Sequence, residues 1–201
     1  MTYVNRNETL VKERIGKDLA KHTITVLRMD GMYRHWVCSS GSFNQRFEII
    51  TWPGSLCYTG DMGDYLFQRT EDMVAFMERS CMSYHYAAEK CVAKGREKIE
   101  EWNEDLFKQH LKDRIRQGKM FTVLRQGNRR TESTKEKIRE IISEYENYSQ
   151  PQDALKAMYE SGLWDELPDC NDYTQNFLWC LHAIKWFCKN VSVPQEVAFS
   201  E

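Results

Sequence analysis

Two hydrophobic patterns divide the chain, and they meet near residue 70. From residue 22 to 69, short runs rich in β-branched and aromatic residues alternate with Gly, Pro, Asp and Ser, which is typical of strands joined by tight turns. From Thr70 onward, apolar residues recur at helical spacing almost to the end. We predict an α+β fold, an antiparallel β-meander packed by helices and followed by a mostly helical C-terminal region. The expected division is 1–80, holding the sheet, and 81–201, helical and packed on it.

The β-rich segment predicts an antiparallel meander of four or five strands. Asp30-Gly31 is a strong hairpin signal, because both turn residues must accept positive φ. Pro53-Gly54 suits a turn in which Pro presets φ and Gly takes the left-handed position. Trp52, directly before this turn, is expected to be largely buried. The expected strands cover residues 22–29, 32–39, 46–52, 55–59 and 65–69.

Helices are expected on both sides of these strands. Residues 1–21 form a short amphipathic pattern. Thr70 is the expected N-cap of the first helix after the sheet, because its hydroxyl can accept a backbone N–H, and Glu71 and Asp72 complement the helix dipole there. The later helices are expected at residues 83–117 (with Gly95 as a possible break and Gly118 as C-cap), 133–148, 151–162 and 174–191.

Composition agrees with a globular protein. Of 201 residues, 41% are hydrophobic and 29% are charged, which argues against wholesale disorder. The N-terminus lacks the apolar run of a secretory signal, and no stretch approaches the length of a membrane span. We therefore expect a soluble, intracellular protein. Its seven cysteines are odd in number and dispersed, which predicts reduced, buried thiols.

One segment of the predicted sheet is distinctive. Residues 47–69 contain Trp52-Pro53-Gly54, then Gly60-Asp61-Met62-Gly63, then an aromatic-x-Phe-x-Arg run at 65–69. In this order the motifs resemble a family of small proteins carried by tailed bacteriophages and prophages, over about residues 22–80. The resemblance implies a phage origin and expression in the cytoplasm of the bacterial host, and it implies no reaction. The glycines also have a plain structural interpretation, since each motif fits a tight turn.

The sequence presents no convincing catalytic or metal centre. Asp61 and Asp64 share a Gly-rich loop, but a divalent cation needs more oxygen ligands than the loop supplies, so turn capping by Asp61 is favoured. Cys81, His85 and Cys91 lie close together without a second pair at zinc-finger spacing. We therefore expect no metal and no cofactor. A small enzyme whose site forms only on folding stays open as an alternative.

Charge is separated into two opposed blocks, although the formal net charge is only −2. Residues 112–139 hold ten Lys or Arg and three acidic residues, a net charge of +7. Residues 140–172 hold nine acidic residues and one Lys, a net charge of −8, with aromatic residues interspersed. Two solvated helix faces that partly neutralise each other would explain both blocks. The functional interpretations are a basic strip for phosphates and an acidic face for a cationic protein.

We expect a phage-encoded inhibitor of a bacterial host defence, either a CRISPR effector complex or a defence nuclease, that acts by stoichiometric protein binding. An acidic face bearing aromatic residues can occupy a basic channel in place of a phosphate backbone. The choice of host defence follows from the phage resemblance. The candidate partner-binding residues are Glu144, Glu146, Trp164, Asp165 and Glu166. The alternative is a phage accessory protein that binds nucleic acid through residues 112–139, chiefly through Arg125, Arg129 and Arg130.

Overall fold

The computed structural model describes residues 5–124, 136, 139, 140, 143, 151–160 and 166–191. These residues divide into two compact units. The larger unit holds the described residues up to Glu100 and those from Tyr173 onward, and the smaller unit holds those from Glu101 to Asp172. The limits differ from the division at residue 80 that the sequence suggests, because a helix after Tyr173 shares the core of the sheet.

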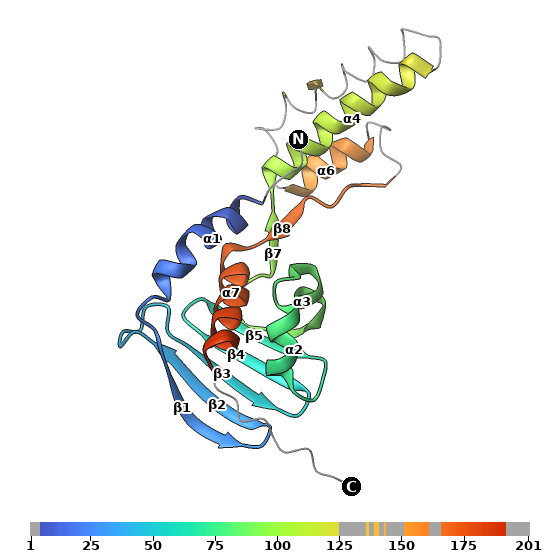
Figure 1. Cartoon of the computed structure of the whole chain (residues 1–201). Coiled ribbons are helices and arrows are strands. Elements are labelled where there is room, and N and C mark those ends of the chain that lie inside the picture. Colours follow the sequence, from blue (N-terminus) through green and yellow to red (C-terminus); the bar gives the residue numbers. More distant parts are fainter. Residues whose placement is uncertain are drawn as a thin grey trace. The chain divides into compact units, whose positions relative to one another are not determined.

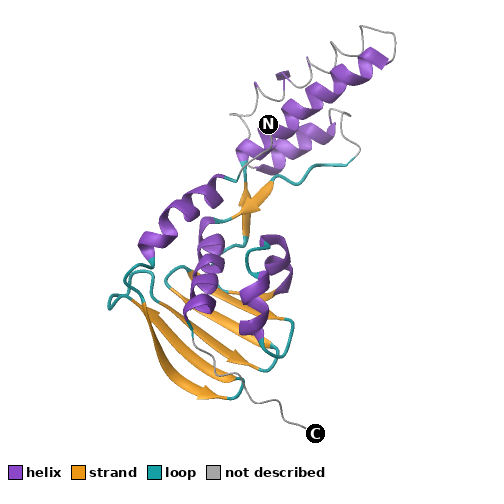
Figure 2. Ribbon diagram, in the orientation of Figure 1, coloured by secondary structure: helices purple, strands orange, loops and turns teal. Residues whose placement is uncertain are grey.

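A six-stranded antiparallel sheet forms the centre of the larger unit (Figures 1 and 2). Each strand pairs with the next in chain order, so the predicted α+β class and antiparallel meander are confirmed. Five strands match their predicted ranges within two residues, and the sixth is additional. The strands are β1 (Thr23–Asp30), β2 (Tyr33–Ser39), β3 (Phe47–Trp52), β4 (Ser55–Gly60), β5 (Gly63–Gln68) and β6 (Cys91–Lys94).

The structure contains both predicted hairpin turns, and one of them is displaced by one residue from its predicted position. Pro53-Gly54 forms the predicted turn, with φ of 78° at the glycine. In the first hairpin, Asp30 still pairs with Tyr33, so the loop is Gly31-Met32 and not Asp30-Gly31. Gly31 has a φ of 54°, a left-handed conformation that favours glycine, and this explains the glycine at this turn position.

The Gly-Asp-Met-Gly motif forms the turn between β4 and β5. Gly63 has a φ of 136°, which L side chains rarely adopt. A Cβ on Gly60 would lie 2.4 Å from the carbonyl oxygen of Arg46, so only glycine fits that close approach. The Asp61 carboxylate accepts the backbone N–H of Gln45 at 2.8 Å, and Gln45 has a φ of 57°. Asp61 therefore caps a turn, as predicted, although the turn is that of the neighbouring β2–β3 loop.

Helices cover one face of the sheet (Figure 1). The helix at Gln175–Asn190 has nine buried side chains, and it packs on the helices at Arg6–Asp18 and Met73–Ser80. Side chains of β2 and β3 that point to this face are buried, and Trp36 meets Phe187 with ring centroids 5.0 Å apart. These helices are α1 (Arg6–Asp18), α2 (Met73–Ser80), α3 (Tyr84–Lys90) and α7 (Gln175–Asn190).

The long helix expected at 83–117 is wrong for its middle part. Helix α3 ends at Lys90, and the chain continues as β6, in which Ala93 pairs with Leu66. β-Branched Val92 and the glycine at 95 favour helix poorly, and the Gly95 N–H donates to the carbonyl of Asp64 at 2.9 Å. The edge of β5 thus offers backbone hydrogen-bonding groups to residues 91–94, which form a strand there and not a helix.

The smaller unit has its own apolar core, in which Phe107, Leu111 and Met158 are fully buried. The chain enters it through β7 (Glu100–Trp102) and leaves it through β8 (Asn171–Tyr173), and these strands pair. Its described helices are α4 (Glu104–Leu124) and α6 (Pro151–Glu160). Because α4 continues through Gly118, that glycine is not a C-cap.

Candidate protein-binding face

The sheet has a second face on which no helix of the larger unit packs (Figure 2). Along β2 and β3 every second side chain is buried beneath the helices, and the alternate ones are half-buried or exposed. Antiparallel sheets with one covered face normally present polar side chains on the other. The composition of this second face is therefore informative about binding.

Strand register arranges the outward side chains in rows that cross the strands. The middle row runs from His35 through Ile50, Cys57 and Leu66 to Ala93, each directly opposite the next. Directly opposed residues in antiparallel strands have Cβ atoms about 4.5–5.5 Å apart, so their side chains touch. The row is thus continuously apolar from β3 to β6.

Two aromatic residues extend this row toward one end of the sheet. Trp52 follows Ile50 by two positions, so it shares the outward face, and it is partly exposed. Trp52 is thus largely but not fully buried and lies outside the core, because Phe47 and Ile49 occupy the inward positions of β3. Tyr33 on β2 is 53% exposed. We call this surface the open face, made up of Tyr33, His35, Ile50, Trp52, Cys57, Leu66 and Ala93.

A charged cluster borders the open face. His35 Nε2 lies 2.5 Å from one carboxylate oxygen of Glu48, and the Arg46 guanidinium donates to the other at 2.5 Å. Burial alone would raise the pKa of Glu48, but these hydrogen bonds and charges outweigh it and hold the pKa below its usual range. Arg28 lies 5.9 Å above the Tyr33 ring at the outer strand. The rim can therefore offer both charges to a partner.

The β2–β3 loop presents a further aromatic side chain. Phe43 is 88% exposed, which is unusual for a large apolar residue. The loop is ordered locally, because Ser39 Oγ accepts the Gly41 N–H at 3.0 Å and donates to the Ser42 carbonyl at 3.1 Å. Phe43 is thus held on the surface by a locally ordered loop.

Most of the site residues proposed from the sequence lie outside the part of the chain that the structure describes. Glu166 is exposed, as a contact residue must be. The others lie outside the described residues, so their roles stay predictions: Arg125, Arg129, Arg130, Glu144, Glu146, Trp164 and Asp165.

Three titratable side chains that the sequence separates widely meet between α1, α3 and α7. Tyr84 Oη lies 3.0 Å from His182 Nε2 and donates to Glu8 at 3.4 Å. Burial raises the pKa of Tyr84 to about 12. Burial lowers the pKa of His182, helped by Lys12 and opposed by Glu8. The phenol is therefore protonated and the imidazole mostly neutral at pH 7, an arrangement suited to joining three helices.

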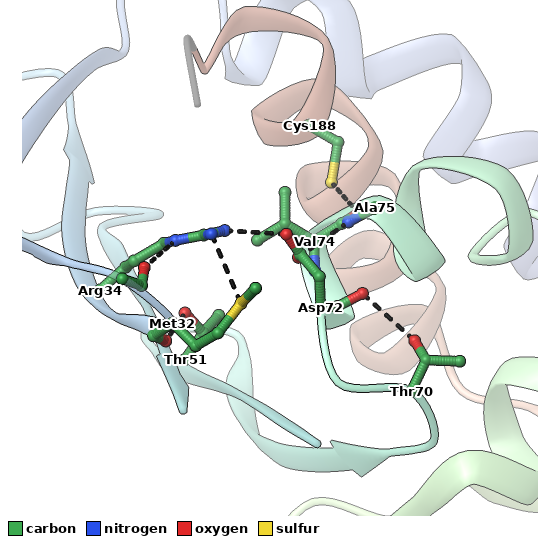
Figure 3. A network of polar contacts seen from close by, with 9 residues as sticks. Met32, Arg34, Thr51, Thr70, Asp72, Val74, Ala75 and Cys188 are labelled. Carbon is green, nitrogen blue, oxygen red and sulfur yellow. Dashed lines mark hydrogen bonds and ion pairs between the residues drawn. The ribbon is translucent and has the colours of Figure 1, made fainter. Parts of the chain in front are cut away.

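A second polar network joins the sheet to α2 (Figure 3). The Arg34 side chain is 3% exposed, and its guanidinium donates to the Gly31 carbonyl at 2.6 Å and to Asp72 at 3.1 Å. Asp72 also accepts the N–H groups of Val74 and Ala75. Asp72 is therefore the N-cap of α2, and the assignment of that role to Thr70 is wrong. The network fixes the start of α2 against the sheet, which is a structural role.

The thiols show a similar preference for the interior. All seven cysteines are free, and five are buried. Cys81 follows α2 and is buried, whereas Cys91 is half-buried on β6. In the described part of the chain, no three His, Cys, Asp or Glu side chains are placed to hold a metal ion.

No described helix is both long enough and apolar enough to span a bilayer. No family model, curated protein or solved structure matches the chain. Function is therefore inferred from the residues of this chain, and the open face is the surface that points most directly to a binding partner.

Proposed function

We propose that the protein is a phage-encoded inhibitor of a bacterial host defence and acts by stoichiometric binding to a protein. The open face carries this proposal. Its middle row is apolar, two aromatic residues lie beside it, and charged residues form its rim. Protein interfaces have this anatomy, with an apolar centre rich in aromatic residues and a polar border.

The class of target comes from the motifs at residues 47–69, which resemble proteins of tailed phages. A CRISPR effector complex or a defence nuclease binds nucleic acid through basic surfaces. The block at 140–172, with a net charge of −8, can compete for such a surface. In this proposal the open face supplies apolar contact, and the acidic block supplies complementarity of charge.

Pull-down from lysate of the bacterial host, with nuclease treatment, tests the proposal. We expect a protein partner that survives nuclease and saturates at a fixed stoichiometry. Tyr33→Ala and Trp52→Ala should weaken capture, because aromatic anchors dominate most interfaces. Val92→Ala is the control, since Val92 is a 54% exposed apolar residue that lies outside both the open face and the acidic block. If the control variant loses the partner and the open-face variants keep it, the open face is not the interface.

Charge reversal separates the inhibitor from the nucleic-acid-binding alternative. Changing the acidic candidates Glu144, Glu146, Asp165 and Glu166 to Lys should abolish capture of the protein partner. Binding should also weaken as salt rises, because screening acts over about 8–10 Å at physiological ionic strength. Changing Arg125, Arg129 and Arg130 to Glu should do less harm. The opposite ranking, with naked DNA or RNA as the bound species, would replace the inhibitor with the nucleic-acid-binding protein.

A further inference from the structure

Strand β1 is an unusually exposed edge of the sheet (Figure 1). Among the described residues no strand pairs with its outer side, and seven of its eight residues are exposed. Val26, Leu27 and Met29 are 52%, 57% and 38% exposed. The opposite edge, β6, has only four residues. A long edge strand with exposed apolar side chains is a ready template for pairing with another chain.

A β-bulge determines which face each β1 side chain occupies. Before the bulge, Ile24 pairs with Cys38, a buried inward position, so Ile24 is on the helix-covered face. The register shifts between Val26 and Arg28, and Met29 then pairs with Arg34, which is also buried. Met29 is therefore on the same face as Ile24, although five positions separate them.

The open-face positions of β1 follow the same shift. Thr25 pairs with Val37 before the bulge, and Arg28 pairs with His35 after it. Val37 and His35 are both outward positions of β2. Thr25 and Arg28 consequently share the open face, although three positions separate them. Without the bulge, an odd separation would place two residues on opposite faces.

We propose that β1 pairs antiparallel with β1 of a second copy of this chain, with Thr23 opposite Asp30 and Thr25 opposite Arg28. This register uses the whole strand and extends the sheet across a two-fold axis. Directly opposed residues in antiparallel strands share a face. In a regular strand, residues an odd number of positions apart lie on opposite faces, so Thr25 could not stand opposite Arg28. The bulge in β1 places both residues on the same face, which allows this pairing.

The resulting contacts match in chemistry as well as in face. Ile24 meets Met29 of the second copy on the helix-covered face, and Val26 lies opposite Leu27. Threonines stand opposite Arg28 and Asp30, so no like charges are directly opposed. A register centred on Arg28 would instead oppose two guanidinium groups. The self-complementarity of the full-length register favours a second copy over an unrelated strand.

The contact is small, and this sets how the dimer behaves. Eight residues from each copy take part, against roughly 20–30 a side in a standard interface. We therefore expect a dimer that dissociates on dilution. It is separate from the proposed inhibition, because it needs only purified protein and no partner.

Sedimentation equilibrium of the full chain over a dilution series tests the pairing. The average mass should rise with concentration from 23.9 kDa toward twice that value. Val26→Lys should raise the dissociation constant at least about tenfold, because it places a charge in the apolar seam. Val92→Lys is the matched control, since Val92 is 54% exposed on the opposite edge. A monomer at every concentration, or a dimer lost only with Val92→Lys, would overturn the proposal.

Disulfide trapping tests the register. A mixture of the Thr25→Cys and Arg28→Cys variants should form a crosslinked dimer on mild oxidation, because opposed Cα atoms lie about 4.5–5.5 Å apart, within disulfide range. A Thr25→Cys and Met29→Cys mixture should not, because those side chains occupy opposite faces. Wild-type protein under the same oxidation gives the background from native thiols. Equal crosslinking in both mixtures would rule out this register.

Discussion

At the scale of single residues, position within the alternation of a strand decides what a tryptophan does. Trp36 is fully buried against Phe187, whereas Trp52 points to the open face. Trp36→Ala should lower the free energy of unfolding by about 3–5 kcal/mol, the usual cost of losing a core aromatic residue. Trp52→Ala should lower it by only about 1–2 kcal/mol, because less apolar surface is lost. Urea denaturation measures both, and equal losses would place Trp52 in the core.

Burial also sets the reactivity of the thiols. It raises the pKa of Cys38 to about 12 and those of Cys81 and Cys170 to about 11. The thiolate is the nucleophile, so these groups should react slowly at neutral pH. We expect a thiol reagent to label Cys57 and Cys91, which are half-buried, before the other five. Peptide mass spectrometry after timed labelling checks the order, and early modification of a buried thiol would contradict it.

At the scale of elements, the start of α2 depends on Asp72. Its carboxylate caps the helix and pairs with buried Arg34. Asp72→Ala should therefore lower the free energy of unfolding by about 2–4 kcal/mol, through the lost cap and the unpaired charge. Thr70→Ala should change it by within about 0.5 kcal/mol, since the Thr70 hydroxyl only donates to the Asp72 carbonyl.

Thermal unfolding of these variants, with Asp72→Asn added, separates the two contributions. The amide of Asp72→Asn retains an acceptor oxygen for the helix N–H groups but loses the charge that Arg34 needs. We therefore expect its stability to lie between those of the wild type and Asp72→Ala. A Thr70→Ala variant as unstable as Asp72→Ala would restore Thr70 as the cap.

Local signals explain which elements were predictable. Five strands and the Pro53-Gly54 turn follow from β-branched runs and turn residues, which act within a few positions. Strand β6 does not, because it depends on the free edge of β5, far away in sequence. The open face was hidden for a related reason. In β3 both alternating sets contain large apolar residues, Phe47 and Ile49 against Ile50 and Trp52, so the pattern cannot say which face helices cover.

At the scale of the larger unit, the two ends of the described chain close one core. Helix α7 packs on α1, and Trp179 donates its indole N–H to Asp18 at 3.0 Å. Asn7 donates to the carbonyl of Tyr173 at 3.1 Å, at the point where the chain returns through β8. The helical cover of the sheet is therefore completed by α7 only after residues 101–172 have been synthesised.

The contact of Glu8, Tyr84 and His182 between α1, α3 and α7 lets us predict how the stability of the protein responds to acid. Burial lowers the pKa of His182, Lys12 of α1 lowers it further, and Glu8 opposes both. The folded state thus binds a proton at this imidazole less readily than the unfolded state, whose histidine has a pKa of about 6.5. As pH falls below about 6.5, the unfolded state takes up more protons, and this group makes the free energy of unfolding decrease. Above that range it contributes no pH dependence.

Urea denaturation at a series of pH values between about 7 and 5 tests this expectation. His182→Gln should reduce the loss of stability on acidification, because it removes the titrating group while retaining a polar side chain near Tyr84. His85→Gln is the control for loss of an imidazole, since His85 is exposed on α3. If His182→Gln leaves the slope of stability against pH unchanged and His85→Gln flattens it, then protonation at the α1–α3–α7 junction is not what destabilises the fold in acid.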